Sequence, residues 1–420
     1  MLALEFIRRH PGVVKRAAEL KGEPAPVDEI LELDRLWREH QTVAETARAR
    51  QNALSKQFAS TRDQKDLENA KQLGEEYRRE IAEADGVKER LDDLLLRVPN
   101  IFHESVPIGE TEADNVVIRE WGTKPDLAFA ARTHYDLGEA LGIMDFERAA
   151  RVAGSRFAFL VGEGARLERA LVQFMLDVHT REHGYTEMWS PMLVNSASMV
   201  GTANLPKFAD QAFKVEDRDL WLIPTAEVPV TNYHREEILD GDRLPLKYVA
   251  YAPSWRTEAG AAGKDTRGFI RLHQFSKVEL VKVTTAETSL EEFEALTRDA
   301  EDILQRLGLH YQVMAMSTGD MGFAQYKKYD LNAWAPGLDR YLEVSSCSVF
   351  NDFQARRASL RFRAGRGSPP EFAHTINGSG LALPRTLDAI METYQRPDGM
   401  ITVPDVLRPY MGGAEVIGAR

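Results

Sequence analysis

Cysteine is almost absent from this sequence, since Cys347 is the single one among 420 residues. One thiol cannot form an intrachain disulfide or a multi-thiolate metal site, which excludes disulfide-stapled domains and zinc modules built on cysteines. This use of cysteine is typical of a reducing compartment, and we expect the protein to be cytoplasmic.

Long apolar runs are also missing. No stretch approaches the roughly 20 apolar residues that a membrane span needs. The first 18 residues carry Arg8, Arg9, Lys15 and Arg16 among scattered apolar positions. Because no apolar core follows these charges, the segment predicts a short amphipathic helix rather than a signal peptide, and we expect no membrane partner.

Positive charge is in deficit, with 53 basic against 65 acidic residues and a net charge of −12. This balance excludes a protein that coats nucleic acid or an anionic membrane over its whole surface, although a local basic patch is compatible with it. With 43% hydrophobic residues and no repeat, the chain is neither disordered nor collagen-like.

Proline and glycine are scarce in the N-terminal quarter. Residues 27–98 contain no proline, two glycines and many good helix formers, which predicts two long helices. A break near residues 60–63 reverses the chain into an antiparallel coiled-coil hairpin about 50 Å long. The expected seam comprises Ile30, Leu33, Trp37, Ala44, Ala47 and Leu54 in the first helix, and Tyr77, Ile81, Ala84, Leu91, Leu94 and Val98 in the second.

The charge of this hairpin is uneven, because residues 46–62 include no acid while its root is acidic. The basic residues of this tip are Arg48, Arg50, Lys56 and Arg62. Two interpretations stay open at this point: a solvated coiled-coil face, or an arm that contacts the phosphates of a nucleic acid.

A second architecture follows Pro99. An amphipathic helix over residues 166–184 precedes short β-branched and aromatic segments, with further helices at 289–307 and 385–394. The expected strands are residues 221–223, 246–251, 269–283, 311–316 and 341–346. The pattern predicts an α+β fold with a mostly antiparallel sheet, and we place the domain boundary between a helical arm at 1–104 and a second domain at 105–420.

Two short motifs are similar to known zinc-binding and phosphate-binding patterns, but other features of the sequence argue against both functions. His179 and His183 match the H-x-x-E-H pattern of inverted zinc peptidases, but their helix already has an apolar face to bury and no further ligand is identifiable. The glycine-rich residues 258–265 fail the Walker spacing at both ends. They favour a hairpin loop between the strand ending at Arg256 and the strand starting at Phe269.

The segment 269–283 has an unusual polar face. Strand alternation places Arg271, His273, Phe275, Lys277 and Glu279 on one side, opposite an apolar back. Cross-strand ion pairs explain the charges, yet Phe275 among them suits the stacking of a nucleotide base. Arg256 and Arg385 then become candidate phosphate clamps. Glu343 and Ser346 offer oxygens of the kind that Mg²⁺ prefers, provided that a bulge puts both on one face.

Several of these segments resemble the class II aminoacyl-tRNA synthetases in their seryl form. Residues 256–258 with 265–279 resemble motif 2, and Asn377 to Ala382 followed by Arg385, Thr386 and Leu387 resemble motif 3. The helix leading to Pro191 is similar to motif 1, the dimer-forming element of that family. Together with the hairpin, the resemblance to seryl-tRNA synthetases spans nearly the whole chain.

The resemblance implies roles for individual residues. Those implied to bind ATP are Arg256, Thr257, Glu258, Arg271, Leu272, Phe275, Glu343, Val344, Ser345, Ser346 and Arg385. Those implied to bind serine are Thr225, Ala226, Glu227, Arg256, Glu279, Asn377 and Ser379. Arg256, Arg385 and Glu279 would be catalytic, Glu343 and Ser346 would hold Mg²⁺, and Arg48, Arg50, Lys56 and Arg62 would contact tRNA.

The resemblance also implies an activity: ATP-dependent activation of L-serine to seryl-adenylate and transfer to tRNA(Ser), with tRNA(Sec) as a further substrate, by a homodimer. The alternatives are a carrier-protein aminoacylating ligase, a non-catalytic RNA-binding paralogue, a purely structural coiled-coil protein and a zinc hydrolase. The sequence departs from the family pattern at Pro384, Val349 and Asn351, which affects fine geometry rather than the reaction.

Overall fold

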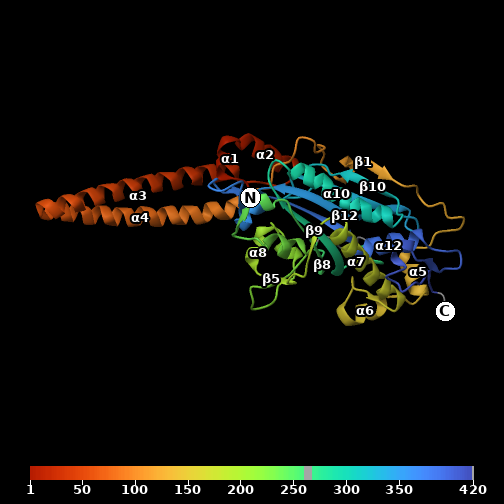
Figure 1. Cartoon of the computed structure of the whole chain (residues 1–420). Coiled ribbons are helices and arrows are strands. Elements are labelled where there is room, and N and C mark those ends of the chain that lie inside the picture. Colours follow the sequence, from red (N-terminus) through yellow and green to blue (C-terminus); the bar gives the residue numbers. More distant parts are fainter. Residues whose placement is uncertain (260–266, 419–420) are drawn as a thin grey trace. The chain divides into compact units, whose positions relative to one another are not determined.

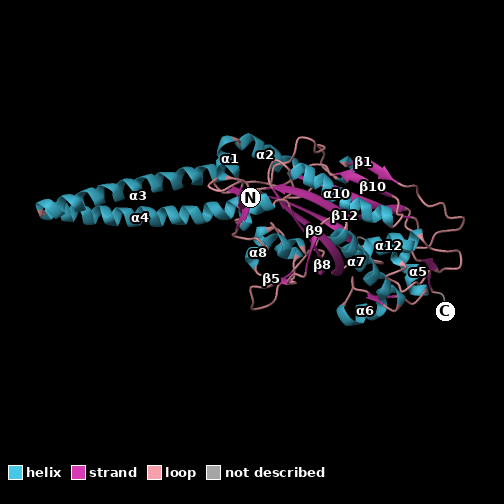
Figure 2. Cartoon of the chain, in the orientation of Figure 1, coloured by secondary structure: helices cyan, strands magenta, loops and turns pink. Residues whose placement is uncertain are grey.

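The computed structural model describes residues 1–259 and 267–418, and the chain divides into two compact units, with the boundary between Ile101 and Phe102. The first unit contains helices and the second is built on a large sheet (Figures 1 and 2). The helices of the first unit are α1 (Leu4–Arg9), α2 (Pro11–Leu20), α3 (Val27–Thr61) and α4 (Gln64–Leu95). The prediction of a single helix over the first 18 residues is wrong. Two helices form there, because Pro11 lacks an N–H and starts a new helix.

The predicted helical hairpin is confirmed, and α3 and α4 run side by side (Figure 1). Arg62 reverses the chain with a left-handed φ of 59°, and its N–H donates to the carbonyl of Phe58 at 2.8 Å. Asp63 then accepts a hydrogen bond from the N–H of Lys65 at 2.9 Å and caps α4. Two residues therefore suffice for the turn.

Small residues form much of the hairpin's seam, which lets the two helices approach closely. Of the expected seam, Ile30, Leu33, Ala44, Ala47, Ala84, Leu91 and Val98 are buried. Trp37, Leu54, Tyr77, Ile81 and Leu94 are only half-buried, and Ala70, Gly74 and Leu95 are buried members that the pattern missed. Asp34 is also fully buried, with Nε of Arg8 and of Arg38 each 3.2 Å from its Oδ2.

The second unit is an α+β fold around one eight-stranded sheet. The order is β1 (Val116–Trp121), β10 (Tyr311–Ala315), β11 (Lys327–Ala335), β12 (Arg340–Asn351), β15 (His374–Ala382), β9 (Gln274–Thr284), β8 (Leu246–Trp255) and β4 (Thr186–Met188). All neighbouring strands pair antiparallel except β4 and β8. The mostly antiparallel sheet predicted from the sequence is confirmed.

Smaller elements surround this sheet. The remaining strands are β2 (Met144–Asp145), β3 (Phe159–Leu160), β5 (Leu193–Val194), β6 (Trp221–Leu222), β7 (Ile238–Asp240), β13 (Arg361–Arg363), β14 (Glu371–Phe372), β16 (Ile401–Thr402) and β17 (Val416–Ile417). The α-helices are α5 (His134–Ala140), α6 (Phe146–Ala153), α7 (Glu163–Arg181), α8 (Ser196–Gly201), α9 (Glu227–Asn232), α10 (Ser289–Arg306), α11 (Phe353–Ala358) and α12 (Leu383–Thr393). Short 3₁₀ turns lie at Glu112–Asp114, Ala209–Gln211, Gly241–Arg243 and Asp405–Leu407.

The main core lies on the face of the sheet covered by α7, α10 and α12. Val278 and Leu280 of β9 pack there with Phe293 of α10 and Leu387 of α12. Alternation therefore turns Lys277 and Glu279 to the opposite face. The sheet thus separates an apolar back from a polar front, as the sequence predicted for this strand.

The strand expected at 269–283 is shorter than predicted, since β9 begins at Gln274 and residues 267–273 form turns. Gly268 has a φ of +76°, which no strand residue adopts. Arg271 and His273 are therefore not on the strand face. Two central strands, β11 and β15, were not predicted from the sequence.

Truncating the hairpin seam tests how the first unit is stabilised. Leu91→Ala removes a fully buried side chain and should lower the free energy of unfolding of this unit by about 2–4 kcal/mol. Hydrogen exchange across α3 and α4 measures the loss. Val43→Ala is the matched control, because Val43 is 41% exposed and its truncation should cost under about 0.5 kcal/mol. Equal effects of the two substitutions would contradict the assigned seam.

Candidate active site

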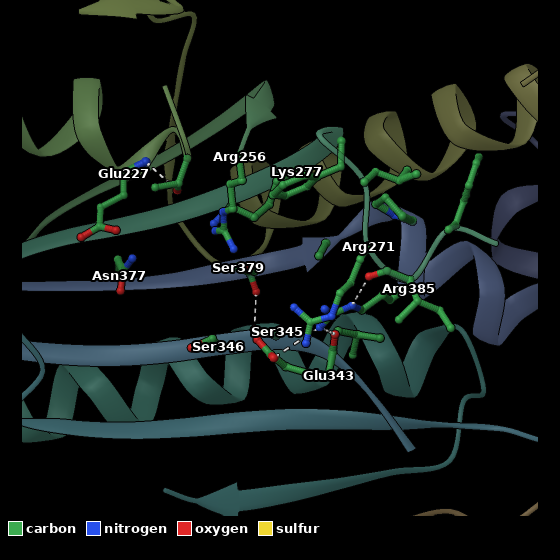
Figure 3. A pocket seen from close by; sticks show the side chains of 18 of the residues that line it. Glu227, Arg256, Arg271, Lys277, Glu343, Ser345, Ser346, Asn377, Ser379 and Arg385 are labelled. Atoms are coloured by element: carbon green, nitrogen blue, oxygen red, sulfur yellow. Dashed lines mark hydrogen bonds and ion pairs between the residues drawn. The ribbon is translucent and has the colours of Figure 1, made fainter. Parts of the chain in front are cut away.

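A polar cleft of about 310 Å³ opens on the front of the sheet, over β9, β12 and β15 (Figure 3). Most of the residues singled out from the sequence converge on it. Those that line it are Thr225, Glu227, Arg256, Glu258, Arg271, Leu272, Phe275, Glu343, Val344, Ser345, Ser346, Asn377, Ser379 and Arg385. Segments far apart in the chain therefore build one site.

Glu279 lies beneath one end of this cleft, where the strand register sets its surroundings. It pairs with Ala250 of β8 on one side and with Ser379 of β15 on the other. Its carboxylate accepts a hydrogen bond from Oγ1 of Thr225 at 2.6 Å and one from Nδ2 of Asn377 at 3.4 Å. The side chain is fully buried and forms an ion pair with Lys277. This end can recognise a small ligand through hydrogen bonds.

A second carboxylate, Glu227, starts α9 at the same end. Its Oε1 accepts a hydrogen bond from Nε2 of Gln354 at 2.7 Å. Burial and the nearby charge of Glu279 raise the pKa of Glu227 to about 7. Two neighbouring carboxylates, of which Glu279 pairs with Lys277, suit a cationic ligand group, whose charge would stabilise the ionised form of Glu227.

The middle of the cleft combines an arginine with an aromatic ring. Arg256 lies just past the end of β8, and its guanidinium carbon is 5.1 Å from the centre of the Phe275 ring. Its Nε donates a long hydrogen bond to the carbonyl of Pro224 at 3.4 Å. Nη1 of Arg271 donates to the carboxylate of Glu258 at 3.3 Å. An aromatic face beside two guanidinium groups suits a planar base that carries phosphates.

Arg385 closes the other end, from the first turn of α12. Its Nε donates to the carbonyl of Ile270 at 3.1 Å, and its Nη1 donates to the carbonyl of Glu343 at 2.9 Å. Nη1 also lies 3.3 Å from Oε2 of Glu343. Burial would raise the pKa of Glu343, but the charges of Arg385, Lys328 and Arg256 outweigh it and lower the pKa. Pro384 is accommodated in the first turn of this helix.

A bulge in β12 determines which of its side chains reach the cleft. Asn332 of β11 pairs with Glu343, and the preceding residue, Leu331, pairs with Ser345. Val344 therefore has no pairing partner on β11 and is the bulged residue. The bulge thereby places Glu343 and Ser346 on the same face, which strict alternation forbids. The bulge that a joint role of Glu343 and Ser346 requires is therefore present.

These oxygens fit a magnesium ion that also binds phosphates. Mg²⁺ is usually held by one or two carboxylates together with phosphate oxygens of a substrate, rather than by a full set of protein ligands. Glu343 would supply the carboxylate and Ser346 the hydroxyl. Asp330 pairs with Ser346 in the sheet, and its Oδ1 is buried without a hydrogen-bond partner among the described residues.

Some expected residues stand apart from the cavity. Ala226 is buried, and the side chain of Thr257 donates to the carbonyl of Asp210 at 2.7 Å, so both support the walls. Arg48, Arg50, Lys56 and Arg62 lie in the other unit, where all four are exposed. Gly260 to Thr266, part of the predicted hairpin loop and of the motif 2 resemblance, lie outside the described residues.

Four residues of the site were not predicted from the sequence: Lys277, Gln325, Ser348 and Gln354. Lys277, Gln325 and Ser348 line the cleft, while Gln354 orients Glu227. Strand alternation already put Lys277 on the polar face with Glu279, which is a signal for its role. Gln325 lies in a loop and Gln354 in a short helix, where no periodic pattern marks a functional residue.

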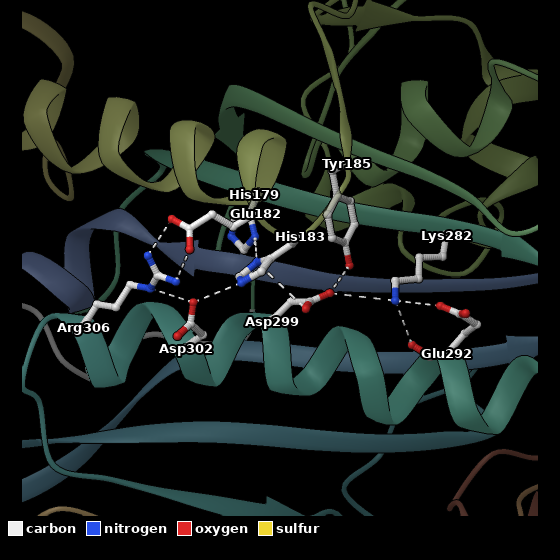
Figure 4. A network of polar contacts seen from close by, with 9 residues as sticks. All are labelled: His179, Glu182, His183, Tyr185, Lys282, Glu292, Asp299, Asp302 and Arg306. Carbon is white, nitrogen blue, oxygen red and sulfur yellow. Dashed lines mark hydrogen bonds and ion pairs between the residues drawn. The ribbon is translucent and has the colours of Figure 1, made fainter.

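His179 and His183 belong to a different polar network, between α7 and α10 (Figure 4). Their Nδ1 atoms are 3.0 Å apart, and Nε2 of His183 lies 3.0 Å from Oδ2 of Asp302. Burial is the main cause that lowers the pKa of His179 to about 3. Within residues 1–259 and 267–418, no group of three or more metal-binding side chains is arranged to hold an ion.

Comparisons with known proteins agree over both units. Residues 1–102 match the family described as "Seryl-tRNA synthetase N-terminal domain", and residues 213–394 match the "tRNA synthetase class II core domain (G, H, P, S and T)". A "Serine--tRNA ligase" of Pelotomaculum thermopropionicum is 52% identical over the full length of both chains.

Two solved structures are similar over nearly the whole chain. The seryl-tRNA synthetase of Pyrococcus horikoshii complexed with ATP has a TM-score of 0.95 and 38% identity, covering 99% of each chain. The cytoplasmic serine-tRNA ligase of Naegleria fowleri in complex with AMP has a TM-score of 0.89 and 32% identity, covering 99% of this chain and 98% of that one. In the described part of this chain, no helix is long and apolar enough to cross a membrane.

The pKa of Glu227 has a measurable consequence for stability. At about 7 it lies above the ordinary value of 4.5, so the folded state binds this proton more tightly than the unfolded state. The contribution to stability is therefore full below pH 4.5 and is lost as the pH rises through about 7. Between pH 5.5 and 7.5, the wild-type protein should lose about 1–2 kcal/mol more unfolding free energy than Glu227→Gln.

Urea unfolding at several pH values measures this difference. Glu291→Gln, at an exposed position of α10, is the matched control and should follow the wild-type curve. Parallel curves for the wild type and Glu227→Gln would show that Glu227 is not the group responsible.

Proposed function

Because this chain belongs to the seryl-tRNA synthetase family, we propose that its cleft is the site where L-serine and ATP react and from which the seryl group passes to tRNA. The enzyme is an ATP-dependent serine–tRNA ligase. The observation that carries the assignment to the cleft is the convergence of Glu279, Phe275, Arg256, Glu343 and Arg385, from separate segments, on a single cavity or its floor.

Serine fits the end of the cleft that contains Glu279 and Glu227. Its ammonium group would lie near Glu227, whose raised pKa falls when a cation neutralises the site. Its hydroxyl would donate to Glu279, which Thr225 and Asn377 hold in place. Its carboxylate would then point toward Arg256, at the centre of the cleft.

ATP fits the rest of the cleft. Phe275 offers a face for the adenine, with Glu258 beside it, and Arg256 and Arg271 stand where the α-phosphate and its neighbours would lie. Arg385 would contact the terminal phosphates after exchanging its hydrogen bond with Glu343 for one with a phosphate oxygen. Glu343 and Ser346 would hold Mg²⁺, which supplies charge neutralisation for the phosphates.

The chemistry needs positioning and charge more than a protein nucleophile. The serine carboxylate attacks the α-phosphorus of ATP, the bond to the bridging oxygen breaks, and pyrophosphate leaves. A ribose hydroxyl at the 3′ end of tRNA then attacks the acyl carbon, and AMP leaves. No histidine or cysteine is among the described residues that line the cleft, so the guanidinium groups of Arg256 and Arg385 carry the stabilisation of negative charge.

Specificity for serine follows from the buried partner of its hydroxyl. Alanine would leave the carboxylate of Glu279 without this donor, and a site of that kind discriminates by about 10⁴-fold. Threonine adds a methyl group beside Thr225 and Ser379, where the two side chains are already buried. Size therefore excludes threonine.

The remaining parts of the proposal concern tRNA and assembly. The exposed basic tip of the hairpin would contact the backbone of tRNA(Ser), and of tRNA(Sec) where that tRNA is present. A second copy of the chain would cover the exposed apolar side chains after α7, where Trp189 is 86% exposed and Leu193 is 45% exposed. The cytoplasm is the proposed location, since the substrates are there.

Two alternatives lose support. Carrier-protein aminoacylating ligases resemble this catalytic domain but lack the long hairpin. Residues 1–102 of this chain, in contrast, match the N-terminal domain of the seryl family. A non-catalytic RNA-binding paralogue has no need for the phosphate-binding side chains, yet Arg256, Glu343 and Arg385 all line the cleft here.

The proposal is tested by ATP–pyrophosphate exchange with each of the twenty amino acids, followed by charging of total tRNA. We expect exchange with serine alone and transfer to tRNA, both unaffected by a zinc chelator. Arg256→Ala should reduce the exchange by more than about 10²-fold, because it removes a charge that faces the reacting phosphate. Serine exchange without tRNA charging would instead support the carrier-type ligase.

A variant of the hairpin tip tests whether the two units have separate functions. It replaces Arg48, Arg50, Lys56 and Arg62 with glutamine. We expect unchanged ATP–pyrophosphate exchange, because these side chains lie in the first unit, and a KM for tRNA raised at least about tenfold, because four phosphate contacts are lost. The control replaces Lys65, Lys71, Arg78 and Arg79 of α4, which also removes four positive charges. A loss of exchange in the tip variant would contradict this division.

A further inference from the structure

A buried group of titratable side chains lies next to the cleft without lining it. It consists of His134 at the start of α5 and Asp388 and Glu392 of α12, each with no exposed side-chain surface. We call these three residues the His134 triad. None of the roles assigned above uses them, and charges removed from water in this way are costly unless they are paired and hydrogen-bonded.

Glu392 holds one side of the imidazole in a fixed state. Its Oε1 accepts from the backbone N–H of His134 at 2.9 Å and lies 2.8 Å from Nδ1. Its Oε2 accepts from the backbone N–H groups of Gly337 and Leu338, at 2.8 and 3.1 Å. Because Glu392 accepts from three backbone N–H groups and lies within hydrogen-bond distance of Nδ1, this geometry makes Nδ1 the donor nitrogen and leaves the lone pair of Nε2 to its own neighbours.

Nε2 of His134 has two competing neighbours. The backbone N–H of Phe269 donates to it at 3.3 Å, and Oδ1 of Asp388 lies 3.5 Å away. Neither carboxylate oxygen of Asp388 has a hydrogen-bond partner within the described chain. The single lone pair of Nε2 can accept from Phe269 or bind a proton shared with Asp388, but it cannot do both.

This choice affects the wall of the cleft. Phe269, Ile270, Arg271 and Leu272 line the cavity. The carbonyl of Ile270 accepts from Nε of Arg385, which lies one turn before Asp388 on α12. A Cβ atom on Gly268 would come within 2.1 Å of Nε2, so the backbone lies directly on the imidazole. His134 of α5 and Arg385 of α12 therefore hold two adjacent residues of this wall, Phe269 and Ile270, and Asp388 and Glu392 of α12 flank the imidazole.

We propose that His134 is a positioning residue for adenylate formation: neutral at Nε2, it fixes Phe269 and with it the cleft wall that presents Arg271, and a proton shared with Asp388 releases that wall. The proposal rests on the proposed function, because adenylate formation is the step it affects. It predicts that the first step fails at acidic pH for a reason located outside the substrate pockets.

The charges around His134 favour its protonated form. The groups that face it are Asp388, Glu392 and Arg385 of α12, Arg340 of β12, Tyr135 of α5, and Arg267, which stacks on the Tyr135 ring. Burial would lower the pKa of His134, but the carboxylates of Asp388 and Glu392 raise it. Burial also raises the pKa of Asp388 to about 7. Both shifts favour a proton shared by His134 and Asp388, and this proton is bound as the pH falls.

The test is the pH profile of kcat for serine-dependent ATP–pyrophosphate exchange at saturating serine and ATP, where titration of the empty serine pocket has no influence. Asp388→Asn removes the anion that favours protonated His134. The acid midpoint of the profile should move to lower pH by about one unit or more. His134→Gln should lose this acid limb and lower kcat at the optimum by about tenfold, with a smaller change in KM for serine.

Asp299→Asn, which removes a half-buried carboxylate of α10 from the network of Figure 4, is the matched control and should keep the wild-type midpoint. An unchanged midpoint in Asp388→Asn, or a wild-type acid limb in His134→Gln, would overturn the proposal, and either variant decides alone if the other does not fold. Absence of serine-dependent exchange in the wild-type protein would instead refute the proposed function.

Discussion

The site depends on the register of one strand, β9, between β8 and β15. This register turns Lys277 and Glu279 to the cleft and Val278 and Leu280 to the core. A shift by one residue would reverse every side chain, burying two charges against α10 and exposing the apolar back. The large apolar area on the back therefore fixes the chemistry on the front.

The strands beside β9 carry small residues where the site needs space. Ala250 and Ala252 of β8 face Glu279 and Lys277 across the sheet. On the other side, a Cβ atom on Gly378 would lie 2.4 Å from Leu296 of α10, so this glycine lets the helix approach β15 closely. The helix α10 therefore packs directly on β15, with no large side chain between them. This packing fixes the positions of Asn377 and Ser379, the neighbours of Gly378 in the strand.

Much of this arrangement could be predicted from the sequence, and the exceptions have physical reasons. The hairpin is local, since helical propensity and spacing suffice to define it. The polar face of β9 follows from alternation, although its first residues are lost to a turn at Gly268. The strand β15 was missed because Gly378 and Gly380 interrupt its pattern. The strand β11 does alternate, with Tyr329, Leu331 and Ala333 buried between Lys328, Asp330 and Asn332, so its sequence carried a signal that was not used.

Residues that act through three-dimensional contacts were the hardest to predict. Gln354 orients Glu227 from a helix 127 positions away in the chain, and the two members of the His134 triad on α12 lie 254 and 258 positions beyond His134. A single sequence gives no sign of such pairings, because each residue looks like an ordinary member of its helix. The bulge at Val344 is similar, since only the pairing with β11 shows that one residue is extra.

The arginines of the cleft show how a site built for charge can fold before its ligand arrives. Arg385 donates to Glu343 and Ile270, and Arg271 donates to Glu258, so their guanidinium groups are oriented in the structure as it stands. These protein acceptors stabilise the folded site against the repulsion between the arginines. Under the proposed function, a phosphate that replaces these acceptors would find donors already in position. Binding energy that would otherwise order the long side chains would then remain for the transition state.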